Sequence, residues 1–173
     1  IEAQTAWTAE IGSRGSAGAV SWDISFYRST LKGEFLQYTV SSGIPASTFN
    51  ADSTIHRGIE AALAVDFMPW LRLRQVYQLN DFRFDDDVQY GDNRLPVVPR
   101  HVYRAELRIG DESLNIAPNL EWVPQAPWAD YANSFRAEGY VLFGFTAGAR
   151  LSDGIDLFLD VRNPFQKKAA GDV

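Results

Sequence analysis

The sequence contains no cysteine, so it has neither disulfide bonds nor thiolate ligands for a metal ion. It also has no apolar run close to the roughly 20 residues that a membrane-spanning helix needs, and no glycine-rich loop of the kind that binds phosphate. These absences leave the cellular compartment open, but they restrict any contact with a membrane to strands.

A basic patch interleaved with aromatic residues is also missing. The 16 Lys and Arg residues are scattered among 22 Asp and Glu residues, which gives a net charge of −6. This balance argues against a nucleic-acid partner, since such a protein must neutralise phosphates. With 173 residues, of which 46% are hydrophobic, the chain is nevertheless long enough to form one folded domain.

Alternation of apolar and polar residues, the period of a β-strand, recurs along the chain. It predicts eight strands, at residues 7–14, 20–27, 54–67, 71–80, 101–109, 114–123, 140–150 and 155–162. The stretch 54–67 is typical: Ile59, Leu63 and Val65 fall on one face, and Glu60 and Asp66 fall on the other. The sequence therefore predicts an all-β, antiparallel, up-and-down fold.

The connections between these strands alternate between short and long. Short connections fall at residues 16–18, 68–70, 110–113 and 152–154, whereas long polar ones fall at 38–53, 84–99 and 124–138. In an up-and-down sheet every second connection lies at the same end, so one rim has tight turns and the other has long loops. This sidedness is typical of outer-membrane barrels, and it favours apolar side chains that face lipid.

Strand length and aromatic placement favour the same interpretation. Several alternating runs reach ten residues or more, about the length that a tilted strand needs to cross a bilayer. Aromatic residues near the strand ends would suit the interfacial girdles of such a barrel, namely Trp7, Trp70, Tyr77, Tyr103, Trp122 and Tyr140.

A series of short segments carries a family resemblance. In chain order these are W-T-A-E-I-G-S-R-G, S-W-D-I-S-F-Y-R-S, N-A-D-S-T-I-H-R-G-I-E-A, Y-G-D-N-R-L-P-V-V-P-R-H-V-Y-R-A-E-L, P-N-L-E-W-V-P-Q and D-V-R-N-P. The series resembles the C-terminal barrel of TonB-dependent receptors over nearly the whole chain. It departs from that family near its end, where Asn163 is followed by Pro164 and Phe165 and a closing strand is missing.

The resemblance implies a plugged outer-membrane barrel of about 22 strands that imports a ferric siderophore or a similar scarce nutrient. Residues 1–173 would form a C-terminal portion of that barrel, about eight strands, without the plug domain and the last strands. The implied partners are the ferric siderophore or a related small ligand, outer-membrane lipid, and TonB through the missing plug. An enzyme is not implied.

Two alternatives stay open on the sequence alone. Eight antiparallel strands can close on themselves as a small outer-membrane barrel. They can also form a soluble, lipocalin-like ligand-binding barrel, in which the same alternation has its faces reversed. The first residue is not Met and the last strand is followed by Lys167 and Lys168, so we expect a piece of a longer chain rather than either alternative.

Ligand-binding candidates lie in the predicted long loops. Tyr90, Arg94, Trp128 and Tyr131 combine aromatic surface with a guanidinium group, which suits an anionic iron chelate. Arg83 and Arg100 flank one of these loops. No cofactor, catalytic group or metal site is predicted, because His56 and His101 lack metal-ligand spacing and the acidic run at Asp85 to Asp87 lacks the spacing of a calcium loop.

Overall fold

The computed structural model describes residues 3–38, 47–136 and 138–167, and within these ranges the chain forms one antiparallel sheet. Its strands are paired in chain order: β1 (Thr5–Ala17), β2 (Val20–Tyr38), β3 (Ser47–Met68), β4 (Leu71–Phe84), β5 (His101–Gly110), β6 (Leu114–Val123), β7 (Tyr140–Ser152) and β8 (Ile155–Arg162). The eight predicted strands and their up-and-down order are confirmed. No helix long and apolar enough to cross a membrane occurs in the described part of the chain.

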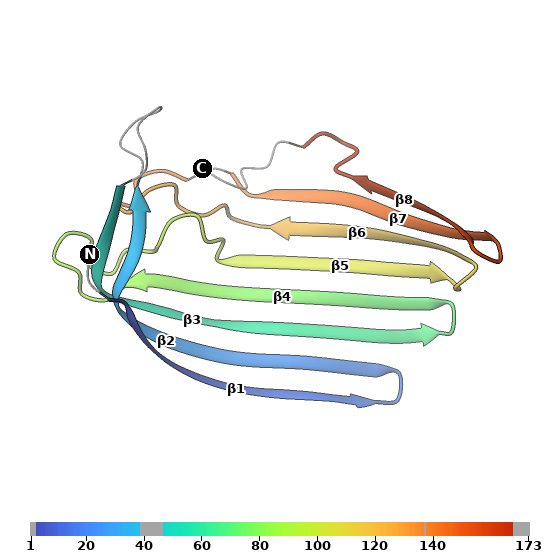
Figure 1. The fold of residues 1–173 in the computed structure, drawn as a ribbon, viewed down its shortest axis with the longest axis horizontal. Helices are drawn as coiled ribbons and strands as arrows, with labels where there is room; N and C mark the ends of the chain where they lie inside the picture. The colour runs from blue at the N-terminus through green and yellow to red at the C-terminus, as the bar shows by residue number, and fades with distance from the viewer. Residues whose placement is uncertain (1–2, 39–46, 137, 168–173) are drawn as a thin grey trace.

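The sheet is open, with β1 at one edge and β8 at the other (Figure 1). Among the described residues, no pairing joins β1 to β8. The eight strands therefore do not close on themselves. The chain forms neither the small outer-membrane barrel nor the lipocalin-like barrel that the sequence alone left open. An open sheet with two edges is what a segment of a larger barrel looks like, because closure removes edges only when all the strands are present.

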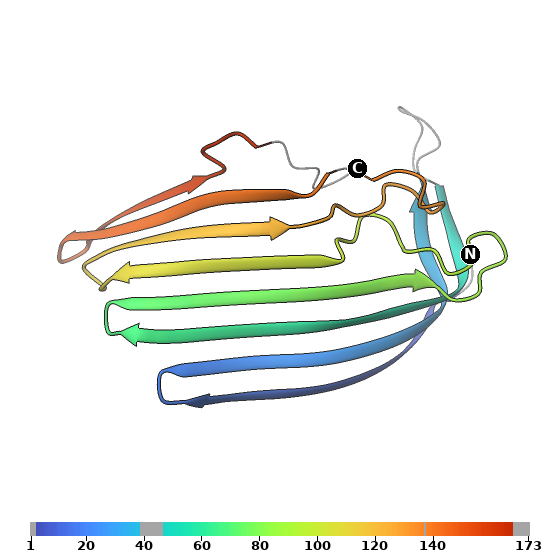
Figure 2. The ribbon, with the colours of Figure 1, turned by 180° about the vertical axis from the view of Figure 1, so that it is seen from behind.

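The predicted sidedness of the connections is confirmed where the structure describes them. The short turns that follow β1, β3, β5 and β7 lie at one end of the sheet, and the connecting residues 85–100 and 124–136 lie at the other end (Figure 2). Asp111 shows how a short turn is held, since its Oδ1 accepts hydrogen bonds from the backbone N–H groups of Ser113 and Leu114.

The structure corrects the boundaries of three strands. The strand predicted at 20–27 continues to Tyr38, and the predicted loop 38–53 is strand from Ser47 onward, paired as Glu34 with Ala51 and Tyr38 with Ser47. Residues 39–46 lie outside the described residues. The strand predicted at 71–80 also runs on, to Phe84.

Gly33 explains why the alternation did not reveal the longer hairpin. Its φ of +66° is in the left-handed region that favours glycine, and it interrupts the extended backbone of β2. Before it, the buried side chain is Leu31, and after it Leu36 packs against the small core, so the buried positions change from odd to even numbers. The distal parts of β2 and β3 turn away from the plane of the sheet (Figure 1).

Register places the apolar side chains on one common face. Ile59 pairs with Phe26 and with Leu79, and residues paired directly across a sheet point to the same side. This face is largely uncovered: Ile11 is 74% exposed and Phe26 is 51% exposed. A soluble protein would bury such a face, whereas lipid solvates it.

The opposite, inward face is polar and tolerates little extra volume at one point. Tyr27 donates a hydrogen bond to Asn80 Oδ1 across β3, and Gly58 lies between them. A Cβ atom at Gly58 would lie 2.3 Å from the Leu79 carbonyl oxygen and 2.6 Å from the Tyr27 hydroxyl oxygen.

We expect Gly58→Ala to destabilise the sheet by about 1–3 kcal/mol, because the strand backbone must move to accept the methyl group. The measurement is the urea concentration that unfolds the full-length protein in detergent, read from the gel mobility that distinguishes the folded from the heat-unfolded form. Gly148→Ala is the matched control, since the nearest atom to its added Cβ is 3.4 Å away. Equal loss in both variants would contradict the packing argument.

Candidate functional site

Aromatic side chains from separate connections gather at the long-loop end of the sheet. The Phe84 ring stacks on Tyr90 with 4.9 Å between ring centroids, and Tyr131 meets Phe49 edge-on at 5.4 Å. Phe84 is fully buried and belongs to a small core with Ala51 and Leu95. Residues 34–38 of β2 pair with residues 47–51 of β3 beyond Gly33, and we call this part of the hairpin the β2–β3 extension. The extension, together with residues 85–100 and 124–136, is called the loop assembly.

Hydrogen bonds fix the loops of this assembly to one another. The Asn133 side chain donates to Arg94 O and accepts from Arg94 N, both at 2.9 Å. Asn93 Nδ2 donates to Tyr131 O at 2.9 Å, and the Tyr131 hydroxyl donates to Gln37 O at 2.7 Å. The loop assembly is therefore an ordered structure rather than a set of independent loops.

A polar group lies beside the aromatic cluster, on β2 and β3. Glu34 Oε2 accepts a hydrogen bond from the Thr54 hydroxyl and lies 3.1 Å from His56 Nε2. The His56 ring stacks on Phe82 with 4.2 Å between centroids, and the side chains of Glu34 and His56 are mostly buried. A carboxylate, an imidazole and an aromatic face are thus held in fixed positions.

These groups line a cavity of about 500 Å³. Its wall combines Glu34 and His56 with Leu95, Asp130 and Tyr131. The volume falls in the range of small-molecule sites, and the mixture of apolar wall and few fixed polar groups is typical of them. The arrangement suits a ligand that stacks on an aromatic ring and donates hydrogen bonds to carboxylates.

The loop environment also shifts ionisation at this wall. Burial raises the pKa of the Tyr131 hydroxyl, which keeps it a neutral donor to Gln37. Asp130 accepts hydrogen bonds from the Ser134 hydroxyl and backbone N–H, and these bonds lower the pKa of its carboxyl. The cavity therefore contains a carboxylate at Asp130 at neutral pH.

The four predicted ligand-binding residues fall in two different surroundings. Tyr90 and Tyr131 pack together in the aromatic cluster, with 5.7 Å between ring centroids. Arg94 lies 3.4 Å from Asp81, and Trp128 is covered by the Arg136 guanidinium at 3.7 Å. Arg94 and Trp128 line, with Arg100, a hollow of about 20 Å³, which has room for about one water molecule.

Sequence reasoning missed Glu34 as a wall residue and Thr54 as the residue that donates a hydrogen bond to it. Both lie near the bend of the β2–β3 hairpin. The sequence predicts no strand at Glu34 and the start of a strand at Thr54. The signal that was present is Gly33 itself, since an isolated glycine in a strand marks a bulge or bend.

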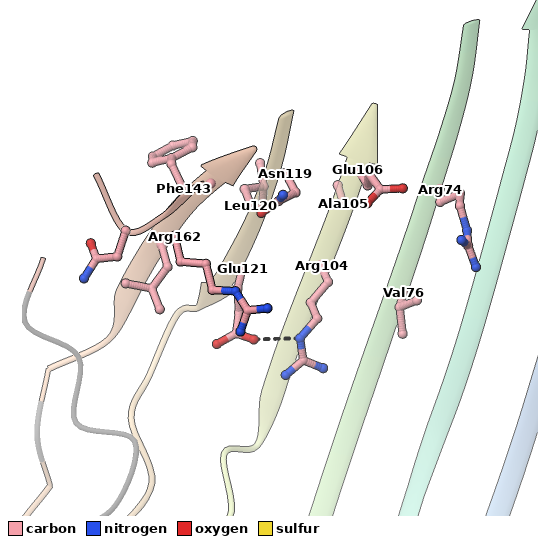
Figure 3. A pocket seen from close by; sticks show the side chains of 13 residues that line it. Arg74, Val76, Arg104, Ala105, Glu106, Asn119, Leu120, Glu121, Phe143 and Arg162 are labelled. Atoms are coloured by element: carbon pink, nitrogen blue, oxygen red, sulfur yellow. Dashed lines mark hydrogen bonds and ion pairs between the residues drawn. The ribbon is translucent and has the colours of Figure 1, made fainter. Parts of the chain in front are cut away.

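A second hollow, of about 410 Å³, lies along the inward face of β4 to β8 (Figure 3). Arg104 Nε donates to Glu121 Oε2 at 2.6 Å, and Arg74, Glu106 and Arg162 point to the same side, whereas Phe143 points away. The wall thus carries charged side chains beside apolar ones such as Val76 and Leu142.

Comparison with known proteins identifies relatives of this sheet. A family model described as "TonB dependent receptor-like, beta-barrel" matches residues 1–163. A search of curated proteins found no match.

Solved structures share the fold at low sequence identity. The ferric yersiniabactin uptake receptor FyuA of Yersinia pestis superposes with a TM-score of 0.77 at 18% identity, over 95% of this chain and 25% of its own. A variant of the Pseudomonas aeruginosa ferric enterobactin receptor PfeA, in complex with enterobactin, gives 0.72 at 18%, over 95% and 26%. The copper transporter OprC gives 0.76 at 13%, over 95% and 26%. The chain thus spans about a quarter of the length of the structures it matches.

We expect Phe84→Ala to loosen the loop assembly while the sheet stays folded, because the change leaves a cavity in a core that is small and local. The cost of such a truncation is about 3–5 kcal/mol. Hydrogen exchange in the full-length protein should become faster across residues 85–95 and 128–133. Phe158→Ala is the control, since that ring is 74% exposed on β8. Unchanged exchange in the loops of the Phe84 variant would show that the cluster does not hold them.

Proposed function

Because this chain belongs to the TonB-dependent receptor-like β-barrel family, we propose that it is part of a receptor that imports a ferric siderophore or a similarly scarce nutrient. Barrels of this family lie in the outer membrane of Gram-negative bacteria, and this chain lies there too. The observation that carries the family assignment is the match over residues 1–163.

In this proposal, residues 1–173 form a C-terminal portion of the barrel wall, and the plug domain and the last strands come from other parts of the same polypeptide. Energy for import reaches the receptor from TonB through that plug. The charged inward hollow around Arg104 and Glu121 then faces the lumen, where a polar plug surface would sit.

The proposed ligand contact is the cavity in the loop assembly. Tyr131 supplies an aromatic wall, Tyr90 supports it from behind, and Glu34 and Asp130 supply acceptors. Ferric siderophores present aromatic or hydroxamate surfaces and hydrogen-bond donors that such a wall can bind. Two of the solved relatives carry the names of ferric siderophore receptors and one that of a copper transporter, so a metal chelate is the substrate class we favour.

Transport by cells tests this proposal. The full-length receptor is expressed in a host that lacks siderophore receptors, and uptake of radioactive iron is measured from ferric enterobactin, ferric yersiniabactin and a ferric hydroxamate, with and without TonB. We expect TonB-dependent uptake of at least one chelate, and about tenfold weaker binding of that chelate by Tyr131→Ala, because a ring contact and its support are lost.

Tyr103→Ala is the matched control, since its hydroxyl bonds Gln75 on the outward face and its ring does not line the cavity. Absence of TonB-dependent uptake for all metal chelates would overturn the receptor proposal. Uptake that is unaffected by Tyr131→Ala would leave the receptor proposal standing and remove the cavity from it.

A further inference from the structure

Four arginines gather on the outward face of the sheet, next to the loop assembly. Arg28 on β2 pairs directly with Arg57 on β3, and Arg57 pairs with Asp81 on β4. Arg83 follows on β4, and its backbone forms an isolated antiparallel β-bridge with Arg94 in the connection 85–100. Directly paired residues share a face, and this face is the apolar one that carries Phe26, Ile59 and Leu79. We call Arg28, Arg57, Arg83 and Arg94 the guanidinium cluster.

One carboxylate holds three of these guanidinium groups. Asp81 Oδ2 accepts hydrogen bonds from Arg57 Nε at 2.8 Å and from Arg83 Nη2 at 2.6 Å, while Arg94 Nη2 lies 3.4 Å from Oδ1. The Asp81 side chain is 10% exposed, and those of Arg57, Arg83 and Arg94 are 49%, 29% and 28% exposed. The cluster is therefore fixed in place, partly open to its surroundings, and positively charged in excess.

Arg28 adds to this excess. It is exposed, and within the described residues no carboxylate forms an ion pair with it. Like charges directly opposite each other in a sheet are unfavourable, as Arg28 and Arg57 are here. Toward the loops, the next charged residues on this face are Lys32 and Asp85. Their charges are opposite and cancel each other, so the excess positive charge of the cluster remains.

The position of the cluster relative to lipid indicates what anion can neutralise it. From Arg57 toward the short-turn end of the sheet, the outward side chains of β3 carry no charge between Ile59 and Phe67. With a strand rise near 3.3 Å per residue and a tilt near 40°, this stretch covers about 20 Å, close to the height of the apolar band of an outer-membrane barrel. The cluster thus lies at the level of the headgroups, on the long-loop side.

The surface beside the guanidinium cluster is amphipathic. A shallow hollow of about 400 Å³ is lined by Arg28, Arg57 and Asp81 together with Ile59 and Leu79. Its cationic part lies toward the loops and its apolar part toward the bilayer. The anion at this level of a membrane is the lipid phosphate, and guanidinium groups bind phosphate oxygens in pairs.

We propose that the guanidinium cluster binds the phosphate group of a lipid in the outer leaflet, with the lipid chain along Ile59 and Leu79. Asp81 is the positioning residue, because it orients Arg57 and Arg83 without contacting the phosphate. This site is on the outside of the barrel, so it does not depend on what the receptor imports.

Native mass spectrometry of the full receptor in detergent tests the site. The probe is bis-phosphorylated lipid A, compared with the same lipid after removal of its phosphates. We expect the dephosphorylated lipid to bind about tenfold more weakly, and Arg28→Gln to lower the affinity for the phosphorylated lipid by about tenfold, because a charge-assisted hydrogen bond is lost. Arg28 holds no ion pair in the described structure, so its replacement should leave the fold intact.

Arg108→Gln is the matched control, since Arg108 is also an exposed strand arginine but lies on the inward face near the short turns. We expect its affinity to stay within about twofold of the parent. Equal binding of phosphorylated and dephosphorylated lipid, or an Arg28→Gln affinity equal to that of the control, would overturn the proposal. Displacement of the lipid by millimolar inorganic phosphate would reduce the cluster to a general anion site and overturn the lipid assignment.

Discussion

Continuous backbone pairing between neighbouring strands is the constraint on which the rest of this structure depends. In lipid, an unpaired N–H or C=O group costs several kcal/mol, so strands can cross only when each is paired along its length. Pairing of this kind forces alternate side chains to opposite faces, and the sequence meets it with apolar residues such as Phe26, Ile59 and Leu79 outward and polar ones such as Tyr27 and Asn80 inward. The two faces then differ in chemistry, and function follows that difference.

At the long-loop end the same pairing continues beyond the bilayer and builds a platform for the loops. The β2–β3 extension bends at Gly33, and Phe84 and Tyr131 join it to the connections 85–100 and 124–139. Because Phe84 is fully buried there, the loop assembly has a core of its own. A rigid rim of this kind presents Glu34, His56 and Tyr131 in fixed positions, which is the requirement for a selective binding site.

Strand existence and order could be predicted from the sequence because alternation is a local signal that lipid exposure makes strong. The end of β2 could not, since the buried positions change from odd to even numbers at Gly33, which breaks the period. For the site, residue type selected Tyr90 and Tyr131, which the structure packs against each other. The position of Arg94 beside Asp81 could not be predicted from the sequence. It depends on the backbone β-bridge between Arg83 and Arg94, a tertiary contact that residue spacing does not encode.

The orientation of the two faces is the central claim, and site-specific accessibility along β3 tests it most directly. Single cysteines can be placed at Ile59, Ala61 and Leu63 and at Glu60, Ala62 and Ala64, because these 173 residues contain no cysteine. Each can carry a spin label in bilayers, in a full-length protein from which any cysteine outside these residues has been removed. Oxygen dissolves in lipid, so we expect it to reach the labels at odd positions more readily than those at even positions. We expect a water-soluble nickel chelate to reach the labels at odd positions poorly. Accessibility without a two-residue period, or with oxygen favouring the even positions, would contradict the account.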